Sequence, residues 1–362
     1  MLSSAAVLMR LAANGRERHS SFCFVLIVPD VIYFFWKYVL EILYGRSFMN
    51  SNVDILLLPL CFWGLYMILE AADWGLSLAA PLVSRNREEN EAILGLLKPG
   101  LDGNELWFFM GQFMVLAAMP AAADDLRSVG TMAVIVLVIL GGLLRLFACL
   151  ARQYFSAPLA MKVMSVLSLG ALAVMGFASS AFLLGLDSFV SLLGAVCAVW
   201  FILSSFQIGC LYGAAKVVNP LGERFRAAFL VSSVLSVLSY ILFAFLLKGT
   251  VGESSVYSDF FWISLVATAI LFGVSFVFTR MRHVKVGLTA AYCSSFFAIA
   301  IYLAAFAATL PQQYSIQLGA VKEALAGIPS TAIFVAAIVW TFGVFIWRLI
   351  RKKQDYQWID HI

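Results

Sequence analysis

The sequence predicts an all-α, polytopic membrane protein with about nine transmembrane helices in bundles, N-out and C-in. The first observation is composition: 63% of the 362 residues are hydrophobic and 12% are charged, with a mean hydropathy of +0.95. Soluble domains are roughly half apolar and a quarter charged. The second is that the apolar residues form runs of roughly 20, the length that crosses a bilayer as a helix. The third is that basic residues gather in alternate connecting segments.

Nine apolar runs qualify as membrane spans. Backbone groups in lipid must be hydrogen-bonded within their own segment, so each run is expected to be a helix. In chain order the predicted spans are residues 55–80, 105–123, 130–151, 161–183, 188–213, 227–247, 259–279, 286–310 and 329–350. They form one transmembrane domain over residues 49–353, followed by a tail at 354–362.

The connecting segments predict the orientation. Most basic residues lie after spans 1, 3, 5 and 7 and in the tail, whereas the opposite segments carry only Arg127, Lys248 and Lys322. The positive-inside rule makes the basic side cytoplasmic. This distribution also explains most of the net charge of +4 without any nucleic-acid partner.

The first 48 residues allow three interpretations. Residues 22–44 are apolar but contain Pro29, Asp30, Lys37 and Glu41. They could form a tenth span or an interfacial helix. Alternatively, translation could begin at Met49, which would make residues 1–48 an incorrectly assigned extension.

Polar side chains within or at the ends of the spans are the first functional candidates, because burying them in lipid is costly. They are Glu70 and Asp73 in span 1, Asp102, Glu105 and Gln112 at the start of span 2, Arg145 in span 3, and Gln207 in span 5. Asp73, Arg145 and Gln207 each lie about 10–14 Å from the cytoplasmic end of their span, at ~1.5 Å per residue.

Two interpretations of these residues stay open. One is a proton or ion route that opens to the cytoplasm. The other is a set of structural contacts, in which Asp73 pairs with Arg145 and Asp102 caps its helix.

The cysteines and histidines point away from metal chemistry. All six cysteines lie in apolar runs without a CxxC pair, so we interpret them as small core residues. The histidines His19, His283 and His361 lie outside the apolar runs. None is therefore placed to bind a buried heme, for which histidine is a common ligand.

Several short motifs follow one another from residue 70 onward. They are Glu-Ala-Ala-Asp-Trp-Gly at 70–75, Arg-Asn-Arg-Glu-Glu at 85–89, Pro-Gly-Leu-Asp-Gly-Asn-Glu-Leu-Trp at 99–107, Leu-Ala-Ala-Met-Pro at 116–120 and Leu-Arg at 144–145. Together they resemble subunit II of cytochrome bd-type quinol oxidases, over about residues 49–353. The Asp-Gly-Asn-Glu-x-x-Trp block is the specific part.

Three departures mark a divergent member. Glu70 replaces the first Asp of the family's DGFD motif and is followed by Ala71 and Ala72. Leu101 stands where the family has Trp, and Leu150 lies in a stretch that lacks the family's acidic residue.

The resemblance implies the non-heme subunit of a quinol:oxygen oxidoreductase in a bacterial-type cytoplasmic membrane. Such enzymes oxidise quinol, reduce dioxygen to water and take the protons from the cytoplasm. Subunit I carries hemes b and the chlorin heme d, and subunit II has no heme ligands. Some members hold a structural quinone. The resemblance does not decide whether a small third subunit is present. The implied partners are therefore subunit I, quinol and membrane lipid.

The resemblance also implies roles for individual residues. Asp102 and Glu70 would line the proton route, with Asp73 and Glu105 near it. Trp107 would lie near the oxygen route, although an aromatic anchor at the membrane interface explains it equally well. The remaining polar residues, expected to be structural, are Asn104, Gln112, Arg145 and Gln207.

Two other classes of function compete with this one. A secondary transporter usually shows repeated halves with helices broken by Gly or Pro at mid-membrane, and no convincing repeat or broken pair is evident. A heme-free membrane scaffold, derived from an oxidase subunit, is compatible with the altered motifs.

Overall fold

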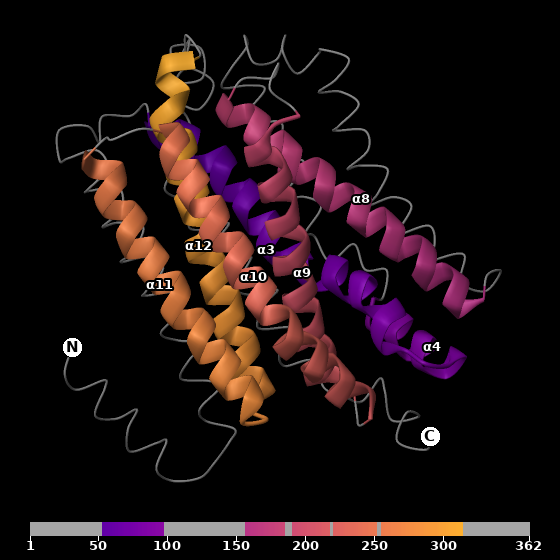
Figure 1. Ribbon diagram of the computed structural model, residues 1–362. Helices are drawn as coiled ribbons and strands as arrows, with labels where there is room; N and C mark the ends of the chain where they lie inside the picture. Colours follow the sequence, from indigo (N-terminus) through magenta and orange to yellow (C-terminus); the bar gives the residue numbers. More distant parts are fainter. Residues whose placement is uncertain (1–52, 98–155, 185–189, 218–219, 252–254, 314–362) are drawn as a thin grey trace, which may run out of the picture.

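The computed structural model describes residues 53–97, 156–184, 190–217, 220–251 and 255–313. Within these ranges the regular structure is helical and contains no strand. The long helices are α3 (Val53–Val83), α8 (Ala157–Leu184), α9 (Leu192–Lys216), α10 (Leu221–Val251), α11 (Ser255–Arg280) and α12 (Val284–Gln313), and the short helix α4 (Arg87–Leu96) follows α3. Figure 1 shows the long helices inclined together as one bundle.

Six of the predicted spans coincide with these long helices. Five of the helices, α8 to α12, are long and apolar enough to cross a membrane. The predicted spans at 105–123, 130–151 and 329–350, and the first 48 residues, lie outside the described part of the chain. Most of these helices run past the predicted span ends, but α9 begins at Leu192, after the predicted start at 188.

Helix α9 is the centre of the bundle and packs against α3, α8, α10 and α12 (Figure 1). Small residues allow this close packing. A Cβ on Gly209 would lie 2.1 Å from the Gly75 carbonyl carbon on α3, and a Cβ on Gly176 of α8 would lie 2.2 Å from the Ala198 Cα. Small residues at helix contacts are typical of membrane bundles, where dispersion contacts and not water exclusion hold helices together.

The turn between α11 and α12 ends α11 with a left-handed residue. Arg282 has a φ of +68°. The Arg282 amide donates to the Thr279 carbonyl (3.1 Å) and the His283 amide donates to the Phe278 carbonyl (2.9 Å). These bonds satisfy carbonyls that the helix end would otherwise leave open. Ser275 then donates to the Gly287 carbonyl (2.8 Å) and holds α11 against α12.

Apolar side chains also cover the outside of the bundle. Val231, Val234, Leu235 and Leu238 on α10 are exposed, as are the α11 residues Val266, Ile270 and Val277. Exposed apolar surface of this extent is typical of a face that meets lipid or a protein partner. Together with the five long apolar helices, this exposed apolar surface indicates a multi-pass membrane protein.

Candidate functional site

Glu70 and Asp73 are carboxyl residues in the interior of α3, a helix that is otherwise largely apolar. Glu70 is 1% exposed, and Asp73 is partly buried one turn later. Ionisable groups in such a position are expensive to bury and are functional candidates by default. The roles of Glu70 and Asp73 as site residues stay predictions.

One tyrosine of α12 lies near Asp73 and also near a tyrosine of α9. Tyr292 of α12 lies within electrostatic reach of Asp73 and of Tyr212 on α9. The Ser77 hydroxyl donates to the Asp73 backbone carbonyl (2.9 Å). Helices α3, α9 and α12 thus bring a carboxyl group and phenol groups together inside the bundle, an arrangement that can hold or pass a proton.

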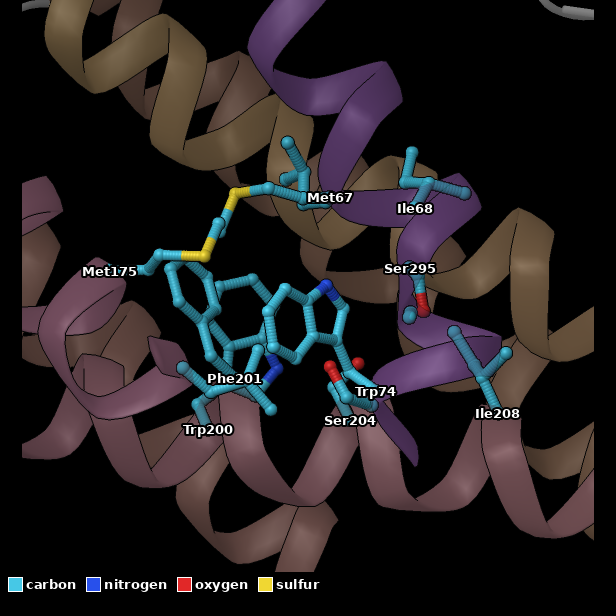
Figure 2. Close-up of a pocket in the computed structure, with 13 residues that line it drawn as sticks. Met67, Ile68, Trp74, Met175, Trp200, Phe201, Ser204, Ile208 and Ser295 are labelled. Atoms are coloured by element: carbon cyan, nitrogen blue, oxygen red, sulfur yellow. The ribbon is translucent and has the colours of Figure 1, made fainter. Parts of the chain in front are cut away.

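A small cavity lies between α3, α8, α9 and α12, and its α3 lining includes Ala71 and Trp74, which follow Glu70 and Asp73 in the sequence. Its volume of about 20 Å³ is enough for roughly one water molecule. Figure 2 shows Trp74 of α3 pointing toward Trp200 and Phe201 of α9, with Met67 and Met175 beside them. The hydroxyl-bearing lining residues are Ser204, Ser205 and Ser295. A water held there would have serine hydroxyls as hydrogen-bond partners.

The Gly75–Gly209 contact fixes the position of Asp73 and Trp74 relative to α9. A Cβ on Gly75 would lie 1.8 Å from the Ser205 carbonyl oxygen, so α3 and α9 touch through their backbones at this point. Asp73 and Trp74 directly precede Gly75. Their positions relative to α9 are therefore set by a contact that admits no side chain.

Gln207 is the third predicted site residue that the structure describes. It is 4% exposed, and its amide nitrogen has no hydrogen-bond partner among the described residues. It lines a second, larger cavity of about 330 Å³ between α9, α10, α11 and α12. The two cavities adjoin each other, because four residues line both: Trp200, Ser204, Ile208 and Ser295.

A polar cluster that the sequence did not predict joins α3, α4 and α10 at one end of the bundle. Arg224 of α10 donates to the Val83 carbonyl at the end of α3 (2.6 Å) and forms an ion pair with Glu89 of α4. Asn86 caps α4 by accepting from the Glu89 amide (2.8 Å). The Glu89 carboxylate in turn accepts from the Arg85 amide (2.6 Å).

Electrostatics keep the Glu89 carboxyl group ionised. Partial burial acts to raise its pKa, but the Arg224 hydrogen bond, the Arg85 amide and both positive charges together lower the pKa below its ordinary value of 4.5. Hydrogen bonds to a carboxylate and nearby cations both favour the charged form. The local sequence signal was Asn86-x-x-Glu89, a capping pattern, but no local pattern could have identified Arg224, which is 135 residues away.

A contact of Arg282 lies at the same end of the bundle as the Arg224–Glu89 pair. Its Nε lies 3.8 Å from a carboxylate oxygen of Glu223, which also pairs with Arg226. The connections after α3, α9 and α11 therefore lie at one end. These are three of the segments in which the sequence concentrates its basic residues.

The other predicted site residues, Asp102, Asn104, Glu105, Trp107, Gln112 and Arg145, lie outside the described residues. The proposed Asp73–Arg145 pair consequently stays a prediction. In the described ranges, no group of three or more His, Cys, Asp or Glu side chains could hold a metal ion. Cys197 and Cys210, which are described, are buried free thiols, as expected for small core residues.

Comparisons with known proteins found a matching family model and a solved structure of similar fold. The family model described as "Cytochrome bd terminal oxidase subunit II" matches residues 53–350. A chain from "The structure of bd oxidase from Geobacillus thermodenitrificans" has a similar fold, with a TM-score of 0.60 at 14% sequence identity. The match covers 82% of this chain and 99% of that one. No protein of curated function matches.

Proposed function

Because this chain belongs to the cytochrome bd terminal oxidase subunit II family, we propose that it is the non-heme subunit of an oxidase that couples quinol oxidation to the reduction of dioxygen to water. The family match over residues 53–350 is the observation that carries this proposal. A complex of this family is an oxidoreductase, and this chain acts in it as a supporting subunit.

The partner is a heme-bearing subunit I, in a bacterial-type cytoplasmic membrane. Hemes b and d would be held by that partner and would supply the electron transfer and the dioxygen chemistry. The chain described here supplies packing surface and polar residues. The assembly that we propose can also include one structural quinone and a small third subunit.

The topology that we propose is nine spans with the N-terminus of span 1 outside and the tail at 354–362 in the cytoplasm. Residues 1–48 form an N-terminal extension of this domain, either as a further helix or as an incorrectly assigned start. The Arg224–Glu89 and Arg282–Glu223 contacts support the orientation, because they gather basic connecting segments at one end.

Within this subunit we propose a proton route that opens at that basic end. Glu70 and Asp73 form its described part, and Asp102 and Glu105 form its entrance. A carboxyl group inside a partly dehydrated bundle can take up and release protons, and Tyr292 near Asp73 offers a further hydroxyl. Trp107 is assigned to the oxygen route.

The first experiment is purification in mild detergent through a tag on the C-terminal tail, followed by a reduced-minus-oxidised absorption spectrum. Heme b and chlorin bands that co-purify with a second membrane chain are the expected result. A heme-free chain that purifies alone, in conditions that keep related oxidases intact, would favour a scaffold or a transporter instead.

The second experiment tests the route in the purified complex. Asp73→Asn and Glu70→Gln keep side-chain size but remove the titrating group, so oxygen consumption should fall while heme content is unchanged. Glu91→Gln is the matched control, because Glu91 lies on α4 and pairs with the exposed Arg87. Equal oxygen consumption in all three variants would remove Glu70 and Asp73 from the route.

A further inference from the structure

The outer face of the bundle carries a groove between α10 and α11. α10 packs mainly on α9, and α11 packs mainly on α12. The larger cavity lies between these two pairs of helices, and its lining includes Ile241 and Phe245 of α10 and Val266 and Ala269 of α11. All four side chains are exposed. The cavity therefore opens along the boundary between α10 and α11, and we call this opening the α10–α11 groove.

The inner wall of the α10–α11 groove is polar. The lining residues with a hydroxyl or amide group are Ser204, Gln207, Ser236, Tyr240, Thr268, Ser294 and Ser295. Tyr240 donates to Thr268 Oγ1 (3.3 Å), and Ser294 donates to the Thr268 carbonyl (3.0 Å). Gln207 Nε2, in contrast, is a buried donor without a partner among the described residues. Because buried donors in membrane bundles are expected to be satisfied, the groove needs an occupant that carries an acceptor.

A positive charge lies at the outer end of the same groove. The Lys248 ammonium is 4.7 Å from the Trp262 ring centroid and 5.3 Å from the Phe261 ring centroid. Phe245, which lines the groove, makes an edge contact with Trp262, with 6.3 Å between ring centroids. In the described ranges, no carboxylate forms an ion pair with Lys248. An occupant with a negative charge at this end would therefore be favoured.

Residues 22–44, which precede the described part of the chain, have a pattern that fits this groove. The run is apolar and long enough to cross a bilayer core as a helix. Asp30, Lys37 and Glu41 are spaced seven and four residues apart, so they share one stripe of such a helix. Charged groups at membrane depth pair with polar groups of the protein. The stripe is therefore expected to face the protein and not the lipid.

The depth of Asp30 matches the depth of Gln207. The basic residues Arg10, Arg16 and Arg18 come before the apolar run and predict that its first residue lies on the cytoplasmic side. Asp30 is nine residues beyond Ser21, roughly 14 Å at 1.5 Å per residue. Gln207 is likewise nine residues before Lys216 at the basic end of α9. Pro29 does not exclude a helix here, because membrane helices tolerate proline.

The outer ends match as well. Glu41 lies three residues before the end of the apolar run at Tyr44, and Lys248 lies three residues before the end of α10 at Val251. A helix over 22–44 that runs parallel to α10 therefore brings the Glu41 carboxylate to the depth of the Lys248 ammonium.

The connection to α3 is long enough. Arg224 at the start of α10 donates to the Val83 carbonyl at the end of α3, so α3 begins at the end of the bundle where Lys248 lies. α3 packs on α9 and α12, the inner wall of the groove, which places the groove about two helix spacings of 8–10 Å from α3. Residues 45–52, at about 3.3–3.6 Å each when extended, span more than this.

We propose that residues 22–44 form a further membrane helix that covers the α10–α11 groove, with the Asp30 carboxyl group accepting a hydrogen bond from Gln207 Nε2 and the Glu41 carboxylate paired with Lys248. Of the three interpretations of the N-terminal extension, this one gives both groups of the groove a partner. The covering helix lies before residues 53–350, the part that the family model matches. It depends on the placement of α8 to α12 in the membrane and not on the heme-bearing partner.

The experiment is disulfide cross-linking in native membranes, with the full chain expressed from its natural gene. Phe34→Cys, on the stripe between Asp30 and Lys37, is combined with Val266→Cys in the groove. Phe34→Cys with Leu169→Cys is the matched control, because Leu169 is exposed on α8 at a similar depth of roughly 20 Å. A protease site inserted after Gly45 separates the N-terminal fragment from the rest of the chain unless a disulfide joins them.

The intact mass of the unmodified protein should include residues 1–48. After oxidation with copper phenanthroline and cleavage, the Phe34→Cys/Val266→Cys protein should stay joined until it is reduced. The Leu169→Cys control should separate, as should Phe34→Cys alone, which tests the native thiols. Glu41→Cys with Lys248→Cys should also stay joined, and this pair decides the matter if the Phe34 variants do not assemble.

Three results would overturn the proposal. The first is a mass that lacks residues 1–48, which would place the start of translation at Met49. The second is an N-terminal fragment that separates in both groove pairs, which would leave the groove to lipid or to another subunit. The third is equal linking of Phe34→Cys to Val266→Cys and to Leu169→Cys. None of these results depends on heme content, so they leave the proposed oxidase function to its own test.

Discussion

Gly75 on α3 and Gly209 on α9 touch backbone to backbone, with no room for a side chain on either. A Cβ on Gly75 would lie 1.8 Å from the Ser205 carbonyl oxygen, and a Cβ on Gly209 would lie 2.2 Å from the Leu76 amide nitrogen. Because the opposing atoms belong to the main chain, a rotamer change cannot relieve either contact. The two helices would have to separate.

Gly75→Ala is therefore expected to destabilise the protein by about 1–3 kcal/mol or more, the usual cost of overpacking. The change should lower the midpoint of thermal unfolding in detergent. Gly170→Ala is the control, because nothing lies within 4 Å of a Cβ at that position on α8. A helix gains from Ala in place of Gly, so the control should be neutral or slightly stabilising. A normal unfolding midpoint in Gly75→Ala would contradict the close α3–α9 contact.

The Arg224–Glu89 pair gives a second stability prediction. Both side chains are less than one-fifth exposed, and Arg224 also binds the Val83 carbonyl. Glu89→Gln should lower the free energy of unfolding by about 1.5–3 kcal/mol, the range for a hydrogen bond to a charged group. Glu91→Gln removes a pair whose Arg87 is 72% exposed and should change stability by less than about 1 kcal/mol. Equal effects of the two changes would show that Arg224 does not join α4 to α10.

The same pair predicts a response to pH. The pKa of Glu89 is lower in the folded protein than its ordinary value of 4.5. Its contribution to stability is therefore complete above pH 4.5 and is lost as the pH falls through the lowered folded-state pKa. Unfolding midpoints measured from pH 6 down to pH 3 should fall less steeply in Glu89→Gln than in the wild type. Parallel curves would mean that Glu89 is not coupled to folding.

Arg282 predicts a stabilising change. Its φ of +68° is a left-handed conformation that costs an L-residue roughly 1–2 kcal/mol. Arg282→Gly should remove this strain, and the ion pair that it gives up, 3.8 Å long at a 74% exposed side chain, is worth little. A net gain of about 1 kcal/mol is expected, reduced by the greater freedom of Gly in the unfolded chain. Arg280→Gly, inside the last turn of α11, should instead destabilise by a similar amount.

The long helices could be predicted from the sequence because hydrophobic run length reports directly on span length. Residues 161–183 and 286–310, for instance, fall within α8 and α12. The short helix α4 was not predicted, because its ten residues are too few and too polar for a membrane span. Its start is set by the Asn86 cap. Helix neighbours were not predictable either. Only the structure shows that α9 lies at the centre, because glycine spacing alone does not say which helices meet.

The candidate site was predicted in part. The rarity of carboxyl groups in apolar runs identified Glu70 and Asp73, and Gln207 was found by the same reasoning. The sequence could not show that Tyr292, over 200 residues away, lies near Asp73, or that Gln207 lines a cavity between α9, α10, α11 and α12. Such relationships depend on helix rotation and packing, which single-chain hydropathy does not encode.

The orientation of the bundle can be tested from the two ends of α10. Glu88 lies at the end where Arg224 meets α4, and Thr250 lies at the other end of α10. Both residues are exposed. In intact cells, an impermeant maleimide should label Thr250→Cys but not Glu88→Cys, because the positive-inside rule places the basic end in the cytoplasm. In inside-out vesicles the pattern should reverse. The parent protein without the added cysteine is the control for the native thiols. Labelling of Glu88→Cys from outside would invert the topology, and the proposed proton route would then open to the wrong side of the membrane.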